Sequence, residues 1–283
     1  AVDQLIRLKY SKTEEVHDPA DIQHPLLREA LVLTGTNGGM EIAAMADVPS
    51  GTGLGSSGSF LVALLHALHA HRGENLPTQA LAEEACHIEI VRAKQPVGKH
   101  DQYMAAFGGI TCLDIAKDGA VQVNPLAISR HAADELRANL LLFYTGVRRD
   151  SYDILREQGE GVREGKRNVL DGMHRILEIG FKIKDALLEE DLRRFGSLLH
   201  EHWTAKKQIS RLMTNGNIDR WYQRGIDSGA LGGKLLGAGG GGFLMFYCES
   251  ENRSRLRQAM ADEGLEAMPF NFEFSGSKVL VNI

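Results

Sequence analysis

Several features that would place this 283-residue sequence in a specialised class are scarce or missing. Its three cysteines, Cys86, Cys112 and Cys248, match neither a disulfide framework nor a metal-binding spacing, so we expect reduced, buried thiols. No apolar run is long enough to span a membrane. Internal repeats and low-complexity tracts are also absent from the sequence. We therefore expect a globular, cytoplasmic protein.

An excess of positive charge is missing as well. The 32 Lys and Arg residues are outnumbered by 37 Asp and Glu residues, which gives a formal net charge of −5. Proteins that bind nucleic acid are more often basic, so we expect neither a nucleic acid nor a membrane as a partner. Hydrophobic residues make up 43% of the chain and charged residues 24%, which is ordinary for a globular protein. The expected partner is a small molecule, and a homodimer is the assembly to test.

The order of the predicted elements indicates two α+β domains rather than one doubly wound sheet. Strands are predicted at 5–10, 41–48, 110–115, 120–123, 140–144 and 243–248. Helices are predicted at 25–33, 57–71, 78–94, 218–230 and 251–263, and 151–211 is almost wholly helical in pattern. We place the domain boundary near Leu136, which gives domains of 1–135 and 136–283.

A glycine-rich segment, Pro49-Ser-Gly-Thr-Gly-Leu-Gly-Ser-Ser-Gly58, joins an apolar strand to an apolar helix. Glycine allows positive φ angles and a close approach of the backbone to a ligand. The N-terminus of the following helix offers free N–H groups and the positive end of the helix dipole. The segment predicts an anion site; a tight turn with serine caps is the alternative. The candidate phosphate-binding residues are Pro49, Gly51, Gly53, Leu54, Gly55, Ser56, Ser57 and Gly58.

Two common nucleotide motifs fit this segment poorly. A Walker A loop is excluded because no Gly-Lys-Ser/Thr ends the segment. Gly53, Gly55 and Gly58 do match the G-x-G-x-x-G spacing of dinucleotide-binding folds. The acidic residue expected about 20 positions later does not follow an obvious strand, so a dinucleotide-dependent oxidoreductase rests on this weak match alone.

The pattern Pro-x-x-x-Gly-Leu-Gly-Ser-Ser resembles the second signature of the GHMP kinases. Lys234-Leu-Leu-Gly-Ala-Gly-Gly-Gly-Gly-Phe243 resembles the third signature of that family, although a flexible turn is the alternative. This resemblance implies an α+β, two-domain GHMP kinase fold, with a ribosomal S5 domain 2-like N-terminal part and a ferredoxin-like C-terminal part. It also implies a phosphotransferase with an alcohol group as acceptor, with ATP and Mg²⁺ as cofactors. The candidate residues of the second loop are Gly237, Ala238, Gly239, Gly240 and Gly241.

The resemblance extends to catalytic residues in Gly98-Lys-His-Asp-Gln-Tyr103. It implies that Asp101 accepts or orients the proton of the substrate hydroxyl, with an Asx-turn or helix cap as the bland alternative. Lys99 is expected to lower the pKa of Asp101 or to contact the transferred phosphate. Ser57 and Glu89 are expected to hold Mg²⁺ together with ATP phosphates and water. We expect the nearby Glu83 and Glu84 to lie on a solvated helix face.

Within the family, the segments 97–109, 142–146 and 238–246 look most like the D-glycero-D-manno-heptose 7-phosphate kinases. That likeness implies phosphorylation of the anomeric hydroxyl to the 1,7-bisphosphate, for nucleotide-heptose and surface polysaccharide synthesis. His100 departs from the pattern, which has Gln there. Arg148 and Arg149 are candidates to bind the sugar's own phosphate. The other candidate substrate residues are His100, Gln102, Tyr103, Gly108 and Gly109.

Other functions stay open on the sequence alone. A galactose or fucose kinase is the nearest rival within the family. A non-catalytic sensor of nucleotide or sugar on the same fold is a rival from another class. The family's first signature is not found in this sequence, so we expect the N-terminal domain to be incomplete at its start, with strands that precede Ala1.

Overall fold

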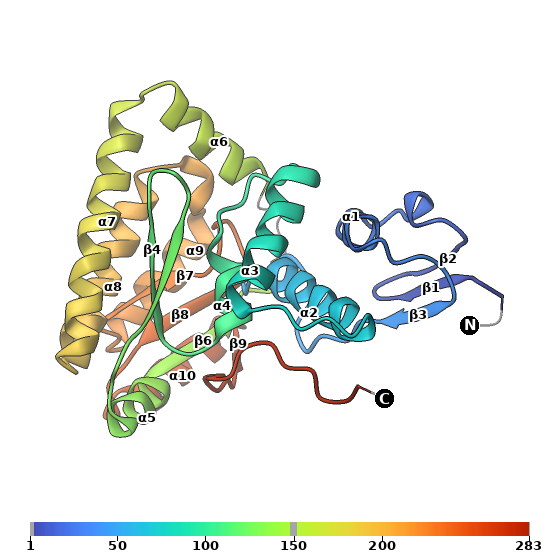
Figure 1. Cartoon of the computed structure of the whole chain (residues 1–283). Helices are drawn as coiled ribbons and strands as arrows, with labels where there is room; N and C mark the ends of the chain where they lie inside the picture. The colour runs from blue at the N-terminus through green and yellow to red at the C-terminus, as the bar shows by residue number, and fades with distance from the viewer. Residues whose placement is uncertain (1–2, 148–151, 283) are drawn as a thin grey trace. The chain divides into compact units, whose positions relative to one another are not determined.

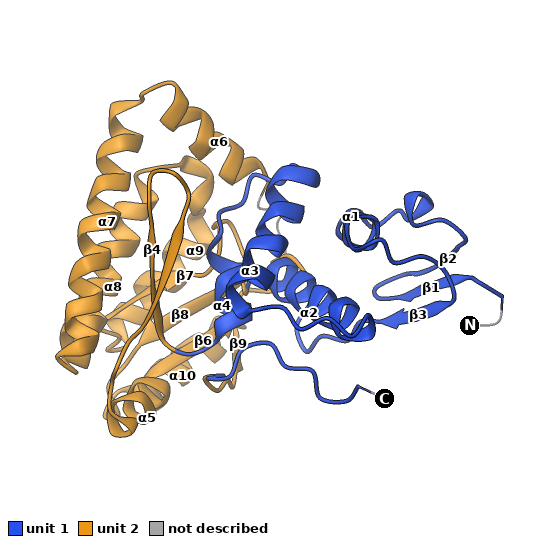
Figure 2. Ribbon diagram, viewed as in Figure 1, with its two compact units in different colours: residues 1–49, 55–109, 273–283 blue, residues 50–54, 110–272 orange. Residues whose placement is uncertain are grey.

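A computed structural model describes residues 3–147 and 152–282 of the chain. The chain divides into two compact units, which are coloured separately in Figure 2. Unit 1 comprises 1–49, 55–109 and 273–283, and unit 2 comprises 50–54 and 110–272. The glycine-rich segment thus contributes residues to both units.

Unit 1 contains a three-stranded sheet with the order β2-β1-β3. Its strands are β1 (Ile6–Lys9), β2 (Thr13–Val16) and β3 (Met40–Ala43). β1 is antiparallel to β2 and parallel to β3. Ile6 and Leu8 are fully buried while Lys9 is exposed, which is the alternation that predicted the first strand. β3 is shorter than the predicted strand at 41–48, because it ends at Ala43.

Helices make up most of the remainder of unit 1 (Figure 1). The long apolar helix α2 packs against its neighbours α1, α3 and α4. The helix predicted at 78–94 is α3 followed by one π-helical turn, η2, and Pro77 rather than Thr78 is its N-cap. The helical elements are η1 (Pro19–Asp21), α1 (Pro25–Thr34), α2 (Ser56–His71), α3 (Thr78–Cys86), η2 (His87–Arg92) and α4 (His100–Phe107).

Unit 2 is built on an antiparallel sheet with the order β7-β8-β6-β9. Its strands are β6 (Leu140–Tyr144), β7 (Gly232–Leu235), β8 (Phe243–Tyr247) and β9 (Glu266–Met268). Both faces of the sheet are apolar: Phe143 and Phe246 belong to one hydrophobic cluster, whereas Leu140 and Tyr247 belong to another. The helical elements of unit 2 are α5 (Arg130–Asn139), α6 (Tyr152–Arg163), α7 (Arg167–Leu188), α8 (Leu192–Lys207), η3 (Arg211–Met213), α9 (Gly216–Asp227) and α10 (Arg253–Asp262).

The strands predicted at 110–115 and 120–123 are present as β4 (Thr111–Ile115) and β5 (Val121–Pro125), which pair antiparallel as a hairpin around Asp118-Gly119. It belongs to unit 2, because the flanking residues Ile110, Leu126 and Ile128 pack against one of the hydrophobic clusters of that unit. The compact units divide between Gly109 and Ile110, and the domain boundary near Leu136 stays a prediction.

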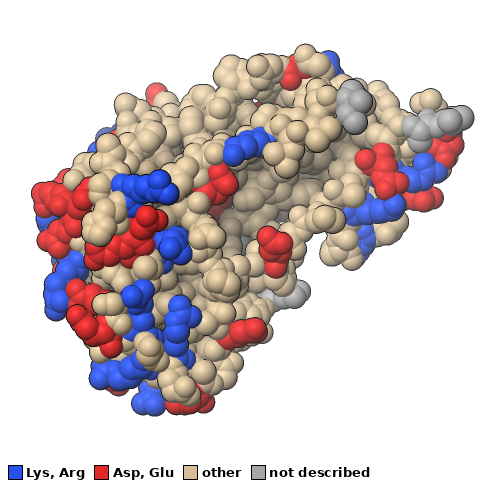
Figure 3. Space-filling model, turned by 90° about the horizontal axis from the view of Figure 1, so that it is seen from below, with Lys and Arg blue, Asp and Glu red and all other residues tan. Residues whose placement is uncertain are grey.

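Surface charge, helix apolarity and cysteine burial can be read from the described residues. Within the described ranges, none of the helices combines the length and apolarity needed to cross a membrane. On the face drawn in Figure 3, acidic and basic side chains are interspersed, without a basic stripe of the kind that binds nucleic acid. All three cysteines are free; Cys86 and Cys248 are buried, but Cys112 is partly exposed, so the expectation of burial was wrong for that residue.

Candidate active site

The N-terminus of α2 in unit 1 is open to an anion. Gly55 is the N-cap and has φ 67°, a left-handed conformation that favours glycine. Ser56, Ser57 and Gly58 form the first turn, and no side chain caps it. The predicted alternative, a turn closed by serine caps, is therefore not what forms. Backbone N–H groups of a first turn without a side-chain cap, at the positive end of a 16-residue helix, favour a phosphate group.

Asp101 lies against this helix N-terminus. A Cβ added to Gly55 would be 3.1 Å from the carboxyl carbon of Asp101. A Cβ added to Gly58 would be 3.0 Å from both Cβ of Asp101 and the backbone nitrogen of Gln102. Glycine at these two positions lets the first turn of α4 approach the first turn of α2. The predicted base and part of the predicted phosphate-binding segment are thus neighbours within unit 1.

His100 precedes Asp101 at the start of α4 and is bonded to it. Nδ1 of His100 lies 2.7 Å from Oδ1 of Asp101, which fits an imidazole N–H that donates to the carboxylate. Both side chains are accessible, with 72% of His100 and 46% of Asp101 exposed. The hydrogen bond occupies one carboxylate oxygen and leaves the other free to meet a hydroxyl group.

Glu89 is a buried carboxylate on the π-helical turn η2 and is 2% exposed. Nε2 of Gln102 donates to Oε2 of Glu89 at 2.6 Å. Oε1 of Gln102 is buried and has no hydrogen-bond partner in the part of the chain that the structure describes. This buried oxygen beside a carboxylate is the donor chemistry that Mg²⁺ prefers. A π-helical turn inside a helix is frequently associated with a functional site.

These donors fit Mg²⁺ bound jointly with a nucleotide rather than an ion held by the protein alone. Among the described residues there is no group of three or more His, Cys, Asp or Glu side chains suited to a metal. Mg²⁺ needs no such group, because it is commonly held by one or two carboxylates, substrate phosphates and water. The structure brings Gln102 to Glu89, and the assignment of Ser57 and Glu89 as ligands stays a prediction.

Two other residues of the same segment face the interior. The hydroxyl of Tyr103 donates to Glu83, its side chain is fully buried, and burial raises its pKa. Nζ of Lys99 donates to Glu83 at 2.9 Å, so its ammonium is directed at that carboxylate. Tyr103 thus packs in the interior of unit 1, and the roles predicted for Tyr103 and Lys99 stay predictions. Glu83 and Glu84 are partly exposed and are both bonded within unit 1, Glu83 to Lys99 and Glu84 to His69 at 2.7 Å.

Gly108 and Gly109 contact the C-terminal segment of unit 1. The N–H of Gly109 donates to the carbonyl of Glu273 at 2.7 Å. A Cβ added to Gly108, whose φ is 69°, would lie 2.5 Å from the nitrogen of Gly276. The close approach of two backbone segments requires glycine at position 108, and the substrate role of Gly108 and Gly109 stays a prediction.

The two predicted glycine loops meet in unit 2. A Cβ added to Gly53 would lie 2.6 Å from the carbonyl oxygen of Leu236, and one added to Gly237 would lie 2.6 Å from Cα of Gly53. A Cβ added to Gly242 would overlap the carbonyl oxygen of Thr52. Each of these glycines has positive φ. The glycines therefore allow residues 50–54 and 236–242 to pack backbone against backbone.

The rest of the second loop is also tightly packed. Gly239 approaches Met213, and the N–H of Gly240 donates to the carbonyl of Met213 at 2.9 Å. A Cβ added to Gly241 would lie 2.8 Å from the carbonyl oxygen of Val147. The alternative of a flexible turn is not supported, because backbone contacts constrain successive residues of the loop.

The sequence did not predict a functional role for one group of basic residues near this loop. Nζ of Lys206, on α8, donates to the carbonyl of Gly237 at 2.6 Å. His202 lies one turn earlier on α8, and Lys234 lies on β7 three residues before Gly237. The charged periodicity of α8 resembled that of an ordinary packing helix. The only signal was Lys234 at the start of the glycine signature.

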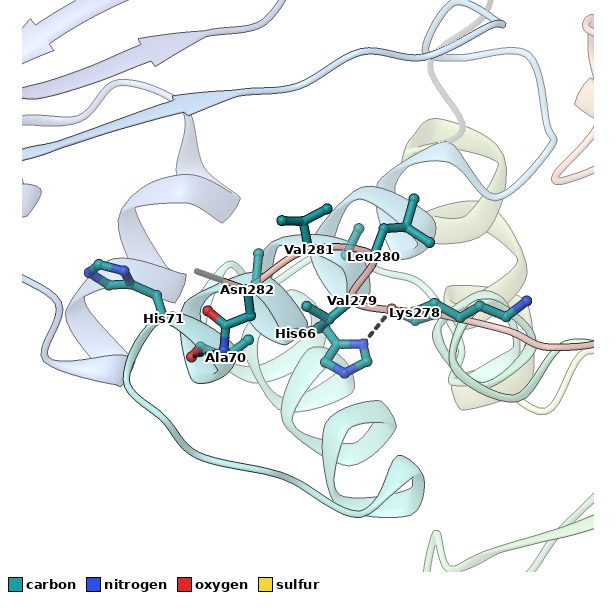
Figure 4. Close-up of a pocket in the computed structure, with 11 residues that line it drawn as sticks. His66, Ala70, His71, Lys278, Val279, Leu280, Val281 and Asn282 are labelled. Atoms are coloured by element: carbon teal, nitrogen blue, oxygen red, sulfur yellow. Dashed lines mark hydrogen bonds between the residues drawn. The ribbon is translucent and has the colours of Figure 1, made fainter.

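Two further regions add nothing to the predicted site. Arg148 and Arg149, predicted to bind the sugar's phosphate, lie outside the described residues. A pocket of about 600 Å³ in unit 1 is formed by α2 and the C-terminal segment, where His66 bonds Ser277 at 2.8 Å (Figure 4). None of the predicted catalytic, phosphate-binding or substrate residues lines this pocket.

Comparisons with known proteins agree with the geometry. The GHMP kinases N terminal domain matches residues 24–109, and the GHMP kinases C terminal domain matches residues 183–266. A D-glycero-alpha-D-manno-heptose 7-phosphate kinase from Campylobacter jejuni is 34% identical over 82% of this chain and 68% of its own length. A bifunctional fucokinase/GDP-fucose pyrophosphorylase from Arabidopsis thaliana is 25% identical over 87% of this chain but only 25% of its own length.

A solved structure shares the fold. The crystal structure of a D-glycero-D-manno-heptose 1-phosphate kinase from Bacteroides thetaiotaomicron superposes with a TM-score of 0.77 and 23% identity, covering 99% of this chain and 85% of that one. The predicted two-domain GHMP kinase fold is confirmed. The chain belongs to the GHMP kinase family and is accordingly a phosphotransferase that uses an alcohol group as acceptor.

Proposed function

We propose that this protein is an ATP- and Mg²⁺-dependent sugar kinase that phosphorylates the anomeric hydroxyl of D-glycero-D-manno-heptose 7-phosphate. The observation that carries the proposal is the position of Asp101 against the open N-terminus of α2. The substrate is supported by the 34% identity to a heptose 7-phosphate kinase. The heptose 1,7-bisphosphate is the expected product.

The first turn of α2 is the proposed phosphate-binding element. Backbone N–H groups of Ser56, Ser57 and Gly58 donate to phosphate oxygens, and the helix dipole favours their negative charge. When bound, ATP supplies the phosphoryl group and Mg²⁺ neutralises charge on the phosphates. Glu89 and Ser57 are the proposed protein ligands of the metal. Gln102 orients the Glu89 carboxylate through the hydrogen bond of 2.6 Å.

Asp101 is the proposed acceptor of the hydroxyl proton. Its Oδ1 is held by His100, so Oδ2 is the atom that takes the proton as the sugar oxygen attacks phosphorus. Asp101 lies in the first turn of α4, which sets the direction of its side chain. Gln102 is the next residue, so the first turn of α4 positions both Asp101, the proposed base, and Gln102, which bonds the proposed metal ligand Glu89.

The test is release of ADP with ATP, Mg²⁺ and a sugar panel of heptose 7-phosphate, free heptose, galactose, fucose and mannose. We expect turnover with heptose 7-phosphate to exceed that with the other sugars. Asp101→Asn keeps the size of the side chain but removes the base, and should lower kcat by about 10²–10⁴-fold. Asp134→Asn, an exposed change of the same kind on α5, is the matched control.

Each other result has a definite meaning. Turnover confined to galactose or fucose would contradict the substrate and keep the kinase chemistry; fucose is included because of the Arabidopsis fucokinase. Binding of ATP without turnover on any sugar would favour a non-catalytic sensor. Full activity in Asp101→Asn would refute the assigned base.

A further inference from the structure

Three basic side chains gather beside the second glycine loop in unit 2. His202 and Lys206 lie four residues apart on α8 and so share one face of the helix. Lys234 lies on β7, whose backbone packs closely on α8, since a Cβ added to Gly232 would overlap the carbonyl oxygen of Gly196. Within 3–147 and 152–282, none of the three forms an ion pair with a carboxylate.

Among the residues that the structure describes, no carboxylate balances the positive charge of this partly buried cluster. Burial lowers the pKa of Lys206 to about 7, and the charge of Lys234 contributes to that shift. Burial, with the charges of both lysines, lowers the pKa of His202 to about 3. Burial also lowers the pKa of Lys234. Uncompensated buried charge costs stability, and apolar residues of similar volume would avoid that cost.

The cluster has hydrogen-bonding capacity that the fold does not use. Nδ1 of His202 is buried and finds no partner among the described residues. An ammonium has three donors, and Lys206 directs one of them to the carbonyl of Gly237. Gly237 in turn touches Gly53 of the first glycine loop. The basic cluster thus adjoins the place where both loops meet within unit 2.

We propose that His202, Lys206 and Lys234 form a binding site for a phosphate group of a small-molecule ligand. The identity of that ligand rests on the proposed function, in which the substrate sugar carries a phosphate of its own. A phosphate of the nucleotide offers the same chemistry, and the experiment separates the two sources. A dianion supplies the missing counter-charge and accepts hydrogen bonds from both lysines.

A binding measurement tests the site without relying on turnover. Inorganic phosphate is titrated into the full chain by calorimetry at pH 7.5, in two buffers with different ionisation enthalpies. We expect binding with net uptake of protons, because phosphate favours the charged form of Lys206. Lys206→Met and Lys234→Met should each weaken binding by at least about tenfold, the loss of one charge-assisted hydrogen bond. Lys182→Met, at an exposed position on α7, is the control.

Kinetics then identifies the source of the phosphate. A higher KM for heptose 7-phosphate in Lys206→Met, with KM for ATP unchanged, assigns the site to the sugar. A higher KM for ATP alone assigns it to the nucleotide, and either result supports a phosphate site. Lys206→Arg keeps the charge and should retain part of the affinity. If circular dichroism shows that Lys206→Met does not fold, Lys206→Arg and Lys234→Met carry the test.

The outcomes separate this inference from the proposed function. Phosphate affinity and both KM values within twofold of wild type in all cluster variants would overturn the site, even if heptose 7-phosphate is phosphorylated. Conversely, wild-type protein that binds phosphate through the cluster but turns over no sugar would refute the proposed function alone.

Discussion

The candidate site in unit 1 and the glycine loops of unit 2 handle negative charge by different means. In unit 1, backbone N–H groups at the N-terminus of α2 lie beside the carboxylate of Asp101, with the buried Glu89 nearby in the same unit. Such a site needs a metal ion, because carboxylates and phosphates repel each other. In unit 2, Lys206 and Lys234 supply positive charge directly. The two proposals therefore differ in kind: in unit 1 a metal ion assists the transfer of a phosphoryl group, and in unit 2 side-chain cations hold a phosphate without a metal.

The largest effect should follow from closing the gap between α2 and α4. In Gly58→Ala, the new Cβ would lie 3.0 Å from Cβ of Asp101 and from the backbone nitrogen of Gln102, a tight contact that pushes α4 away from α2. We expect kcat to fall by about 100-fold, as a shift of about 1 Å in a catalytic group can cause. Steady-state kinetics provides the measurement. Gly180→Ala is the control, since a Cβ there meets nothing within 4 Å on α7. Equal activity of the two variants would show that this contact does not position Asp101.

A smaller effect tests whether the site in unit 1 alone depends on metal. Glu89→Gln keeps the shape of the side chain but removes its charge, so we expect the Mg²⁺ concentration for half-maximal rate to rise at least about tenfold. Titration of Mg²⁺ at saturating ATP measures this value. Lys206→Met should leave it unchanged. If Lys206→Met shifts the Mg²⁺ requirement and Glu89→Gln does not, the contrast between the two units is wrong.

The smallest effect concerns stability. The pKa of Lys206 is about 7 in the folded chain and 10.5 in a model peptide, so the unfolded state binds more protons between these values. The contribution of Lys206 to stability is therefore most unfavourable below pH 7 and improves as pH rises toward 10.5. Urea midpoints at pH 7 and pH 9 should show a larger gain for wild type than for Lys206→Met, without phosphate present. Equal gains would show that Lys206 is not a destabilising buried cation.

Local patterns predicted most of the regular structure. The alternation from Ile6 to Lys9 and the apolar helix after Gly55 are both found in the structure. Several elements escaped prediction, among them β2, β9, α5 and β7. α5 is strongly polar, with only Ala132, Leu136 and Asn139 buried. β7 is short and begins with two glycines, which are unusual in a strand. Glycine is needed at position 232 because the backbone of α8 leaves no room for a side chain there.

The sequence by itself determined the glycine loops, the helix that begins after Gly55 and the family resemblance, because turn geometry and helix capping depend on residues a few positions apart. Only the tertiary structure decided which side chains meet. In the fold, Asp101 lies against Gly58, Lys206 donates a hydrogen bond to the carbonyl of Gly237, and the side chain of Tyr103 is buried. Such partners are distant in sequence, and packing of whole helices and strands sets their separation. The residue types needed for the proposed chemistry could therefore be selected from the sequence, whereas their arrangement in space required the fold.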